Sequence, residues 1–162
     1  MTGRAVIRQA RQTDLEKVVD VFLTCWTISY EPLLPAATLA AMDRDSATTL
    51  WRAALAESSA FVGEDSSVVG VARCTPLAGR AARVDSLYVH PRAQGTGLGG
   101  RLLTTCTDHL RAAGASRATL WVFAPNAPAR AFYARHGWRP TGQQRVEPEF
   151  GVPELELERG LA

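Results

Sequence analysis

Residues 85–103 read DSLYVHPRAQGTGLGGRLL, a predicted strand followed by a glycine-rich turn and the start of a helix. The strand ends before Pro91, and apolar residues recur every four positions from Leu98 to Leu110 on the helix that follows. The N-terminus of such a helix offers unpaired N–H groups and the positive end of its dipole, and glycines let a phosphate approach the backbone. The stretch therefore predicts an anion site, with phosphate as the expected anion.

Two nucleotide-binding motifs compete for this turn. A P-loop ends in Gly-Lys-Ser/Thr, whereas this turn ends in Gly-Gly-Arg at residues 99–101. The Rossmann pattern GxGxxG is met at residues 95–100, but that motif also needs an acidic residue about 20 positions further on, and none occurs between His109 and Glu147. The P-loop is therefore excluded, and a dinucleotide oxidoreductase stays as a disfavoured alternative that NAD binding would test.

The composition predicts one soluble globular domain over residues 1–162. The chain has 46% hydrophobic and 21% charged residues, and no stretch approaches the ~18 apolar residues of a membrane helix. A net charge of +2 with scattered arginines argues against a nucleic-acid partner. Three cysteines without zinc-site spacing predict no metal and suit a reducing cytoplasm. Abundant alanine and arginine, with Lys17 as the single lysine, suggest a bacterial source.

Predicted strands and helices alternate in the second half of the chain, with hairpins on either side. This pattern favours an α/β fold of the α+β type, with a mixed central sheet of about six to seven strands flanked by about four helices. Strands are predicted at residues 5–9, 60–64, 68–74, 82–89 and 118–123 and twice in the tail, the second time at 154–158. Helices are predicted from a capping box at Thr13–Glu16, over 36–56 with an interruption near 43–46, from Leu98 to near Gly114, and from Asn126 to Gly137.

A third phosphate pattern, Q/R-x-x-G-x-G/A, is met by Gln94, Gly97 and Gly99. Here the sequence resembles the GNAT superfamily of acyl-CoA-dependent N-acyltransferases. Residues 126–138, NAPARAFYARHGW, are similar to the second signature of that family, Asn…Phe-Tyr…Gly-Phe/Trp, and lie about 30 residues further on. Trp26 with YEPLLP at residues 30–35 looks like a bacterial branch with a Trp…Tyr-x-x-Leu-Leu-Pro segment. The resemblance covers nearly the whole chain and implies a GNAT-like fold.

The resemblance also implies where acetyl-CoA, the expected cosubstrate, would lie. Its thioester would sit between two parallel strands that splay apart, here 85–89 and 118–123. Backbone groups of Leu87 and Val89 would pair with the pantetheine arm, and N–H groups of residues 94–99 would hold the pyrophosphate. The cofactor-binding residues so predicted are Leu87, Tyr88, Val89, Arg92, Gln94, Gly95, Thr96, Gly97, Leu98, Gly99, Gly100, Asn126, Ala129 and Tyr133.

The reaction that the resemblance implies is aminolysis of the thioester by direct attack in a ternary complex. Tyr133 would be the general acid near the sulfur, and the N–H of Val89 would stabilise the oxyanion. Strand alternation places Arg83, Asp85 and Leu87 on one face and Val84, Ser86 and Tyr88 on the other. On the first face Asp85 is the acidic candidate for the general base, with Glu31 or a water relay as rivals.

The acceptor is expected to be a primary amine of a small molecule or peptide. Its pocket would draw on Trp26, Tyr30 and Glu31, with residues 144–153 closing from the tail. Because no base is clear from the sequence, a non-catalytic acyl-CoA-binding regulatory module stays as the alternative. Homodimers are common in such families, but no interface patch stands out.

Overall fold

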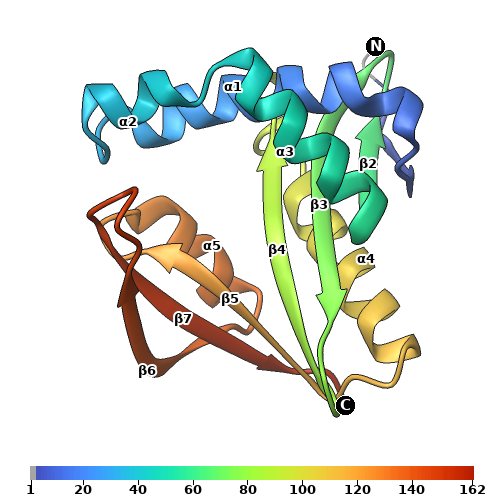
Figure 1. Ribbon diagram of the computed structural model, residues 1–162. Coiled ribbons are helices and arrows are strands. Elements are labelled where there is room, and N and C mark those ends of the chain that lie inside the picture. Colours follow the sequence, from blue (N-terminus) through green and yellow to red (C-terminus); the bar gives the residue numbers. More distant parts are fainter. Residues whose placement is uncertain (1–2) are drawn as a thin grey trace.

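A single mixed sheet organises the chain (Figure 1). The computed structural model describes residues 3–162, in which seven strands follow the order β1-β2-β3-β4-β5-β7-β6. All neighbouring strands are antiparallel except β4 and β5, which are parallel. The predicted fold class is therefore confirmed. The strands are β1 (Val6–Gln9), β2 (Ser59–Glu64), β3 (Val68–Pro76), β4 (Ala81–Val89), β5 (Arg117–Phe123), β6 (Arg139–Val146) and β7 (Pro153–Gly160).

Helices cover both faces of the half of the sheet that contains β2, β3 and β4. Helices α1 and α3 pack on one face and α4 on the other, and each face has its own buried apolar cluster. The helices are α1 (Leu15–Tyr30), α2 (Ala36–Ala41), α3 (Arg44–Glu57), α4 (Leu98–Ala112) and α5 (Ala127–Arg135). The predicted interruption is the break between α2 and α3, where the Asp43 side chain accepts the N–H of Ser46 at 2.8 Å as a helix cap. No helix within residues 3–162 could span a membrane.

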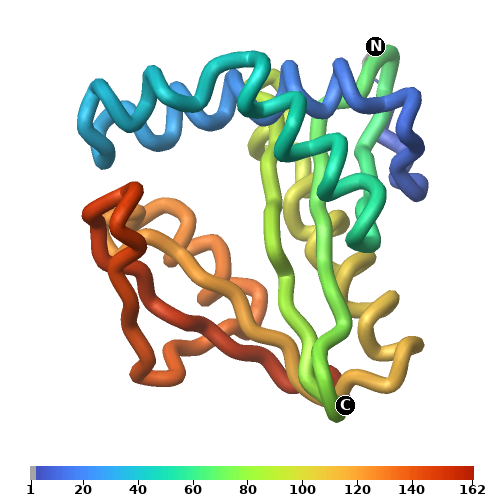
Figure 2. The backbone as a smooth tube through the Cα atoms, viewed as in Figure 1, coloured from blue at the N-terminus to red at the C-terminus, as the bar shows by residue number. Residues whose placement is uncertain are grey.

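The parallel strands β4 and β5 separate soon after they meet. Residues Ala81–Arg83 pair with Arg117–Thr119, and no pairing continues beyond them. Figure 2 shows the two strands diverging from that point like the arms of a V. The inner edges of both strands therefore keep backbone groups that no neighbouring strand uses.

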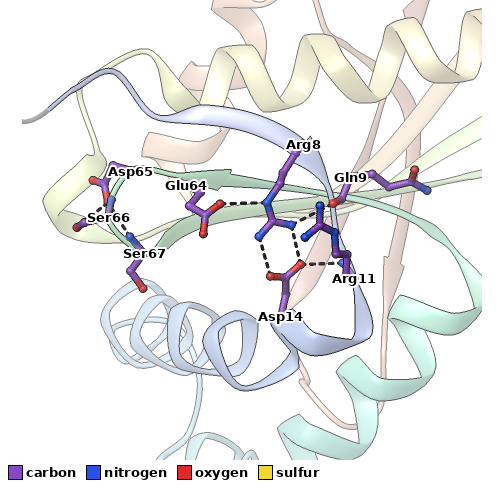
Figure 3. Close-up of polar contacts among 8 residues, drawn as sticks. All are labelled: Arg8, Gln9, Arg11, Asp14, Glu64, Asp65, Ser66 and Ser67. Atoms are coloured by element: carbon purple, nitrogen blue, oxygen red, sulfur yellow. Dashed lines mark hydrogen bonds and ion pairs between the residues drawn. The ribbon is translucent and has the colours of Figure 1, made fainter.

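The start of α1 is fixed by a carboxylate, although not by the predicted capping box. A 3-10 turn (Gln12–Asp14) precedes the helix, and Asp14 accepts the N–H of Arg11 at 2.7 Å. The guanidinium of Arg8 donates to both oxygens of Asp14 at 2.8 and 2.9 Å and also to Glu64 at 3.0 Å (Figure 3). These bonds join the start of α1 to β1 and β2. The predicted capping box was wrong because Asp14, two residues before Glu16, caps the 3-10 turn instead and is held there by Arg8.

A β-bulge at Asp85 changes the predicted faces of β4. Arg73 on β3 pairs with Ser86, while the next residue, Cys74, pairs with Val84, so Asp85 has no pairing partner on β3. An extra residue shifts the side-chain alternation by one position. Val84 and Leu87 consequently pack in the same cluster, on the α4 side, and the predicted grouping of Asp85 with Leu87 was wrong.

Candidate functional site

The glycine-rich turn forms one wall of a cavity of about 520 Å³, which we call the loop cavity. Most of the predicted cofactor residues line it: Leu87, Tyr88, Val89, Gln94, Gly95, Gly97, Gly99, Gly100, Ala129 and Tyr133. Side chains that the sequence did not indicate line it too, among them Cys25 from α1 and Phe132 and His136 from α5. The structure thus brings the turn and α5 together around one space.

The other four predicted cofactor residues have different surroundings. Arg92 donates to both oxygens of Asp65 at 2.7 and 2.9 Å, and the hydroxyl of Thr96 donates to the carbonyl of Ala93 at 2.6 Å. Leu98 is buried in the α4-side core. Asn126 caps α5 by accepting the N–H of Ala129 at 3.3 Å. These four residues therefore shape the turn and the two helices in this structure.

Glycines are required in the turn for two different reasons. Gly95 and Gly97 have φ angles of 75° and 83°, which are unfavourable for residues with a Cβ, and Gly97 immediately precedes α4. Gly99 and Gly100 permit a close helix contact, since a Cβ on Gly100 would lie 2.6 Å from Nε2 of His136. The first turn of α4 thus lies directly against α5, with its N–H groups at the loop cavity.

The end of β4 presents backbone groups to the diverging side of the sheet. The N–H of His90 donates to the carbonyl of Val69 at 2.8 Å, so Gly70 and Val89 form a non-hydrogen-bonded pair. The N–H and C=O of Val89 consequently point away from β3, and so do those of Leu87 two residues earlier. The carbonyl of Val89 accepts bonds from Nε2 of Gln94 at 3.0 Å and Sγ of Cys25 at 3.2 Å.

A second cavity, of about 460 Å³, lies between the α1–α3 layer and β5, and we call it the aromatic cavity. Its rings come from α1, α3, β4, β5, α5 and the loop between β6 and β7, here called the tail: Phe22, Trp26, Tyr30, Trp51, Tyr88, Trp121, Phe123, Tyr133 and Phe150. Phe150 lies 6.0 Å from Trp26 and 5.4 Å from Phe123, measured between ring centres. Of the predicted acceptor residues, Trp26 and Tyr30 line this cavity, whereas Glu31 is exposed and does not.

Charged side chains reach the aromatic cavity from β3, β4, β7 and the tail. Asp85 accepts the hydroxyl of Thr75 at 2.7 Å and Nε of Arg83, and its side chain is 5% exposed. Glu154 accepts Nε of Arg145 at 2.8 Å. The guanidinium carbon of Arg145 lies 4.3 Å from the centre of the Trp121 ring, and this cation–π contact supports a ring that lines the cavity. The sequence indicated Asp85, but it did not indicate Glu154 and Arg145, which the register of β6 with β7 brings together.

The two cavities meet at a cluster of tyrosines. Leu87, Tyr88, Ala129, Tyr133 and Ser29 line both of them. Burial raises the pKa of Tyr30, Tyr88 and Tyr133 above the ordinary value for tyrosine. All three hydroxyls are therefore protonated at neutral pH. The junction can hold two ligands, one from each cavity, beside the Tyr133 hydroxyl.

The thiol of Cys25 is poorly suited to act as a nucleophile at this junction. Burial raises its pKa to about 11, so the thiolate form is scarce at neutral pH. No group of three or more His, Cys, Asp or Glu side chains in the described part of the chain could hold a metal ion.

Comparison with known proteins agrees with this geometry. One relative, the mycothiol acetyltransferase of Beutenbergia cavernae, is 43% identical over 67 residues, which are 41% of this chain and 22% of that protein. The PaiA N-acetyltransferase of Thermoplasma acidophilum, solved in complex with coenzyme A, superposes with a TM-score of 0.84 at 16% identity over 98% of this chain and 99% of its own. YncA of Salmonella typhimurium, a putative acetyltransferase solved with acetyl-CoA, gives 0.74 at 20% identity over 99% and 95%.

The family assignment rests on a longer match. The sequence profile of the acetyltransferase (GNAT) family matches residues 15–138, which include the glycine-rich turn, the diverging strands and α5. This match spans more than half of the chain and confirms the resemblance found in the sequence. The chain therefore belongs to the acetyltransferase (GNAT) family.

Proposed function

We propose that this chain is an acetyl-CoA-dependent N-acetyltransferase of one domain, residues 1–162, that acetylates a primary amine of a small molecule or peptide. The observation that carries the proposal is the junction at Tyr88 and Tyr133, where the loop cavity and the aromatic cavity meet between diverging strands. Two joined cavities suit direct attack in a ternary complex. Three buried cysteines without a disulfide fit a cytoplasmic location, which we also propose.

Acetyl-CoA would occupy the loop cavity. The pantetheine arm would bond to the backbone groups of Leu87 and Val89 that point away from β3, as an added strand does, with the carbonyl of Val89 also accepting from Gln94 and Cys25. The pyrophosphate would accept hydrogen bonds from backbone N–H groups of residues 94–99 at the start of α4, where the dipole favours an anion. Arg92 and Thr96 would hold the shape of the turn through Asp65 and Ala93, rather than bind phosphate directly.

The reacting groups would meet at the junction. The amine nitrogen attacks the thioester carbonyl, a C–N bond forms, and the N–H of Val89 stabilises the oxyanion. When the C–S bond breaks, the Tyr133 hydroxyl gives its proton to the sulfur. Its raised pKa keeps that proton in place until the thiolate forms.

Asp85 is the proposed acceptor of the amine proton. Its carboxylate lines the aromatic cavity and is held in position by Thr75 and Arg83. Because both of its oxygens already accept hydrogen bonds, we expect Asp85 to contribute only modestly as a base. Replacing it with Asn should lower kcat about tenfold, which is below the 10²–10⁴ that a general base usually contributes.

The direct test is release of free thiol from acetyl-CoA in the presence of a panel of primary amines. We expect turnover with at least one amine and an N-acetylated product by mass spectrometry. Saturable CoA binding without turnover across the panel would contradict the proposal. That outcome would favour a non-catalytic acyl-CoA-binding module. In such a module Asp85 would serve only to bond Thr75 and Arg83.

A further inference from the structure

The aromatic cavity contains two charges that the protein does not neutralise. Four ionisable side chains with full charges line it: Arg73, Asp85, Glu149 and Glu154. Arg83 pairs with Asp85 and Arg145 with Glu154. In the part of the chain that the structure describes, no salt bridge joins Arg73 or Glu149 to another side chain. The cavity thus offers one cation and one anion to a ligand.

Arg73 is held in a defined orientation. It projects from β3, its Nε donates to the hydroxyl of Ser86 at 2.9 Å, and its guanidinium carbon lies 5.7 Å from the centre of the Trp51 ring. Within residues 3–162 the guanidinium makes no other hydrogen bond. A planar guanidinium positioned in this way presents its terminal nitrogens as a fork that suits two oxygens of a carboxylate.

The indole groups of the cavity also lack partners. Nε1 of Trp51 and Nε1 of Trp26 are buried and have no hydrogen-bond acceptor, and both side chains line the aromatic cavity. Buried donors without acceptors are uncommon because each one costs free energy. Because both nitrogens are closed to solvent, the donor that the cavity presents to a ligand is Arg73, which favours a ligand that brings oxygen acceptors among the aromatic rings.

We propose that the amine acceptor is an α-amino acid with an apolar or aromatic side chain, whose carboxylate binds Arg73. This inference rests on the proposed N-acetyltransferase function and names its substrate class. The amino group would lie at the junction beside Tyr88 and Tyr133, and the side chain would pack among the rings of the aromatic cavity. Glu149 supplies the negative charge that attracts the ammonium group.

The spacing of the site agrees with this orientation. Ser86, which holds Arg73, is two residues from Tyr88, or about 7 Å along an extended strand. The amino nitrogen and carboxylate oxygens of an α-amino acid are about 3 Å apart, and an arginine–carboxylate hydrogen bond adds about 3 Å. An amino acid bound to Arg73 therefore reaches the junction.

A polyamine fits the same cavity less well. Of the three carboxylates in the aromatic cavity, two are already neutralised by Arg83 and Arg145. The unpaired Arg73 would repel a second ammonium group of the polyamine. Preference for polyamines is consequently an outcome that would overturn the inference.

The test compares each of L-phenylalanine, L-tryptophan, L-leucine and L-methionine with its own amide, with spermidine as a polycation, by thiol release from acetyl-CoA. We expect kcat/KM for the acid to exceed that for the amide at least about tenfold. Arg73→Gln should lower kcat/KM for the acid about 100-fold, mainly through KM, because a site built to bond a substrate group loses most when that bond is missing. The amide should change less than about threefold.

Two further variants control for folding and charge. Arg52→Gln alters an exposed arginine beside Trp51 on α3 and should leave kcat/KM unchanged for both the amino acid and its amide. Arg73→Lys keeps the charge without the fork, so its loss for the acid should be intermediate. Equal rates for acids and amides, a preference for spermidine, or an equal loss on acid and amide in Arg73→Gln would overturn the inference.

A binding measurement separates this inference from the proposed function. Calorimetric titration of each amino acid into CoA-saturated protein should show saturable binding that Arg73→Gln weakens at least tenfold. Absence of amino-acid binding would overturn the inference even if other amines are acetylated. Conversely, amino-acid binding without thiol release for any amine would defeat the proposed function alone.

Discussion

The loop cavity and the aromatic cavity share Tyr133 but are built in different ways. The loop cavity is made mainly from backbone groups and glycines of one continuous stretch, residues 87–100, closed by α5. The aromatic cavity is made from side chains of α1, α3, β3, β4, β5, β7 and the tail. Backbone donors suit a cosubstrate of fixed structure, whereas side chains from many elements can be exchanged singly. We therefore expect changes to the first cavity to act on CoA binding and changes to the second to act on the acceptor.

Tyr133→Phe should have the largest effect, because this residue belongs to both cavities. Without its hydroxyl the leaving thiolate has no positioned proton donor, so kcat should fall about 100-fold. The raised pKa of Tyr133 also predicts that wild-type kcat shows no alkaline decline below pH 10 from this group. Steady-state kinetics check both points, with the CoA dissociation constant as the control. An unchanged kcat would remove Tyr133 from the role of acid.

Gly97→Ala should act on the loop cavity alone. A Cβ at its φ of 83° strains the turn that lines the loop cavity, so CoA affinity should fall at least about tenfold. Gly79→Ala is the matched control, since Gly79 has a φ of 70° in the turn after β3. Both variants should lose about 1 kcal/mol of stability, but equal CoA affinities in the two would argue against the turn as the phosphate site.

Phe150→Ala should act on the aromatic cavity alone. Removing a ring that contacts Trp26 and Phe123 widens the cavity, so KM for the acceptor should rise about fivefold while CoA affinity stays the same. Phe61→Ala, in a half-buried ring on β2 outside both cavities, serves as the control. A change in CoA affinity without a change in KM would contradict the division into two cavities.

The difference between the cavities also explains what the sequence could predict. The turn, the start of α4 and the divergence of 85–89 from 118–123 follow from local signals and from the family resemblance. The structure confirms that divergence, because β4 and β5 pair only at their first residues. Residues 144–153 were predicted to close the acceptor pocket, and Phe150 from this segment lines the aromatic cavity.

Trp26, Tyr30 and Asp85 were predicted, but the other charged side chains of the aromatic cavity depend on strand pairings that a sequence does not display. Arg73 lines the cavity because it pairs with Ser86 on β4. Glu154 lines it on β7, where it pairs with Arg145 on β6. The grouping of Asp85 with Leu87 was wrong because a bulge, set by the register with β3, interrupts the alternation, whereas Asp85 does lie beside Arg83. The unpaired charge of Arg73 becomes visible only when all its neighbours are known.

Asp14→Asn should have the smallest effect on either cavity, because the Asp14–Arg8 pair lies at the start of α1 (Figure 3). Stability should nevertheless fall by about 2–3 kcal/mol, since Arg8 loses its main partner. Arg8 lowers the pKa of Asp14 in the folded state, so this stabilisation is complete above the unfolded value of about 3.9 and is lost as pH falls below it. Denaturant titrations at pH 7 and pH 3 should show a difference between wild type and variant that shrinks at pH 3. If the stability difference between wild type and Asp14→Asn were the same at pH 7 and pH 3, the negative charge of Asp14 would not be the source of the stabilisation.

The central claim is that two ligands meet at the junction of the two cavities and react directly. Initial rates measured over a grid of acetyl-CoA and amine concentrations test it. Double-reciprocal plots should give intersecting lines, because both substrates must be bound before the acetyl group moves. Parallel lines would contradict the account, since they indicate an acetylated enzyme intermediate, for which Cys25, with its pKa of about 11, is poorly suited.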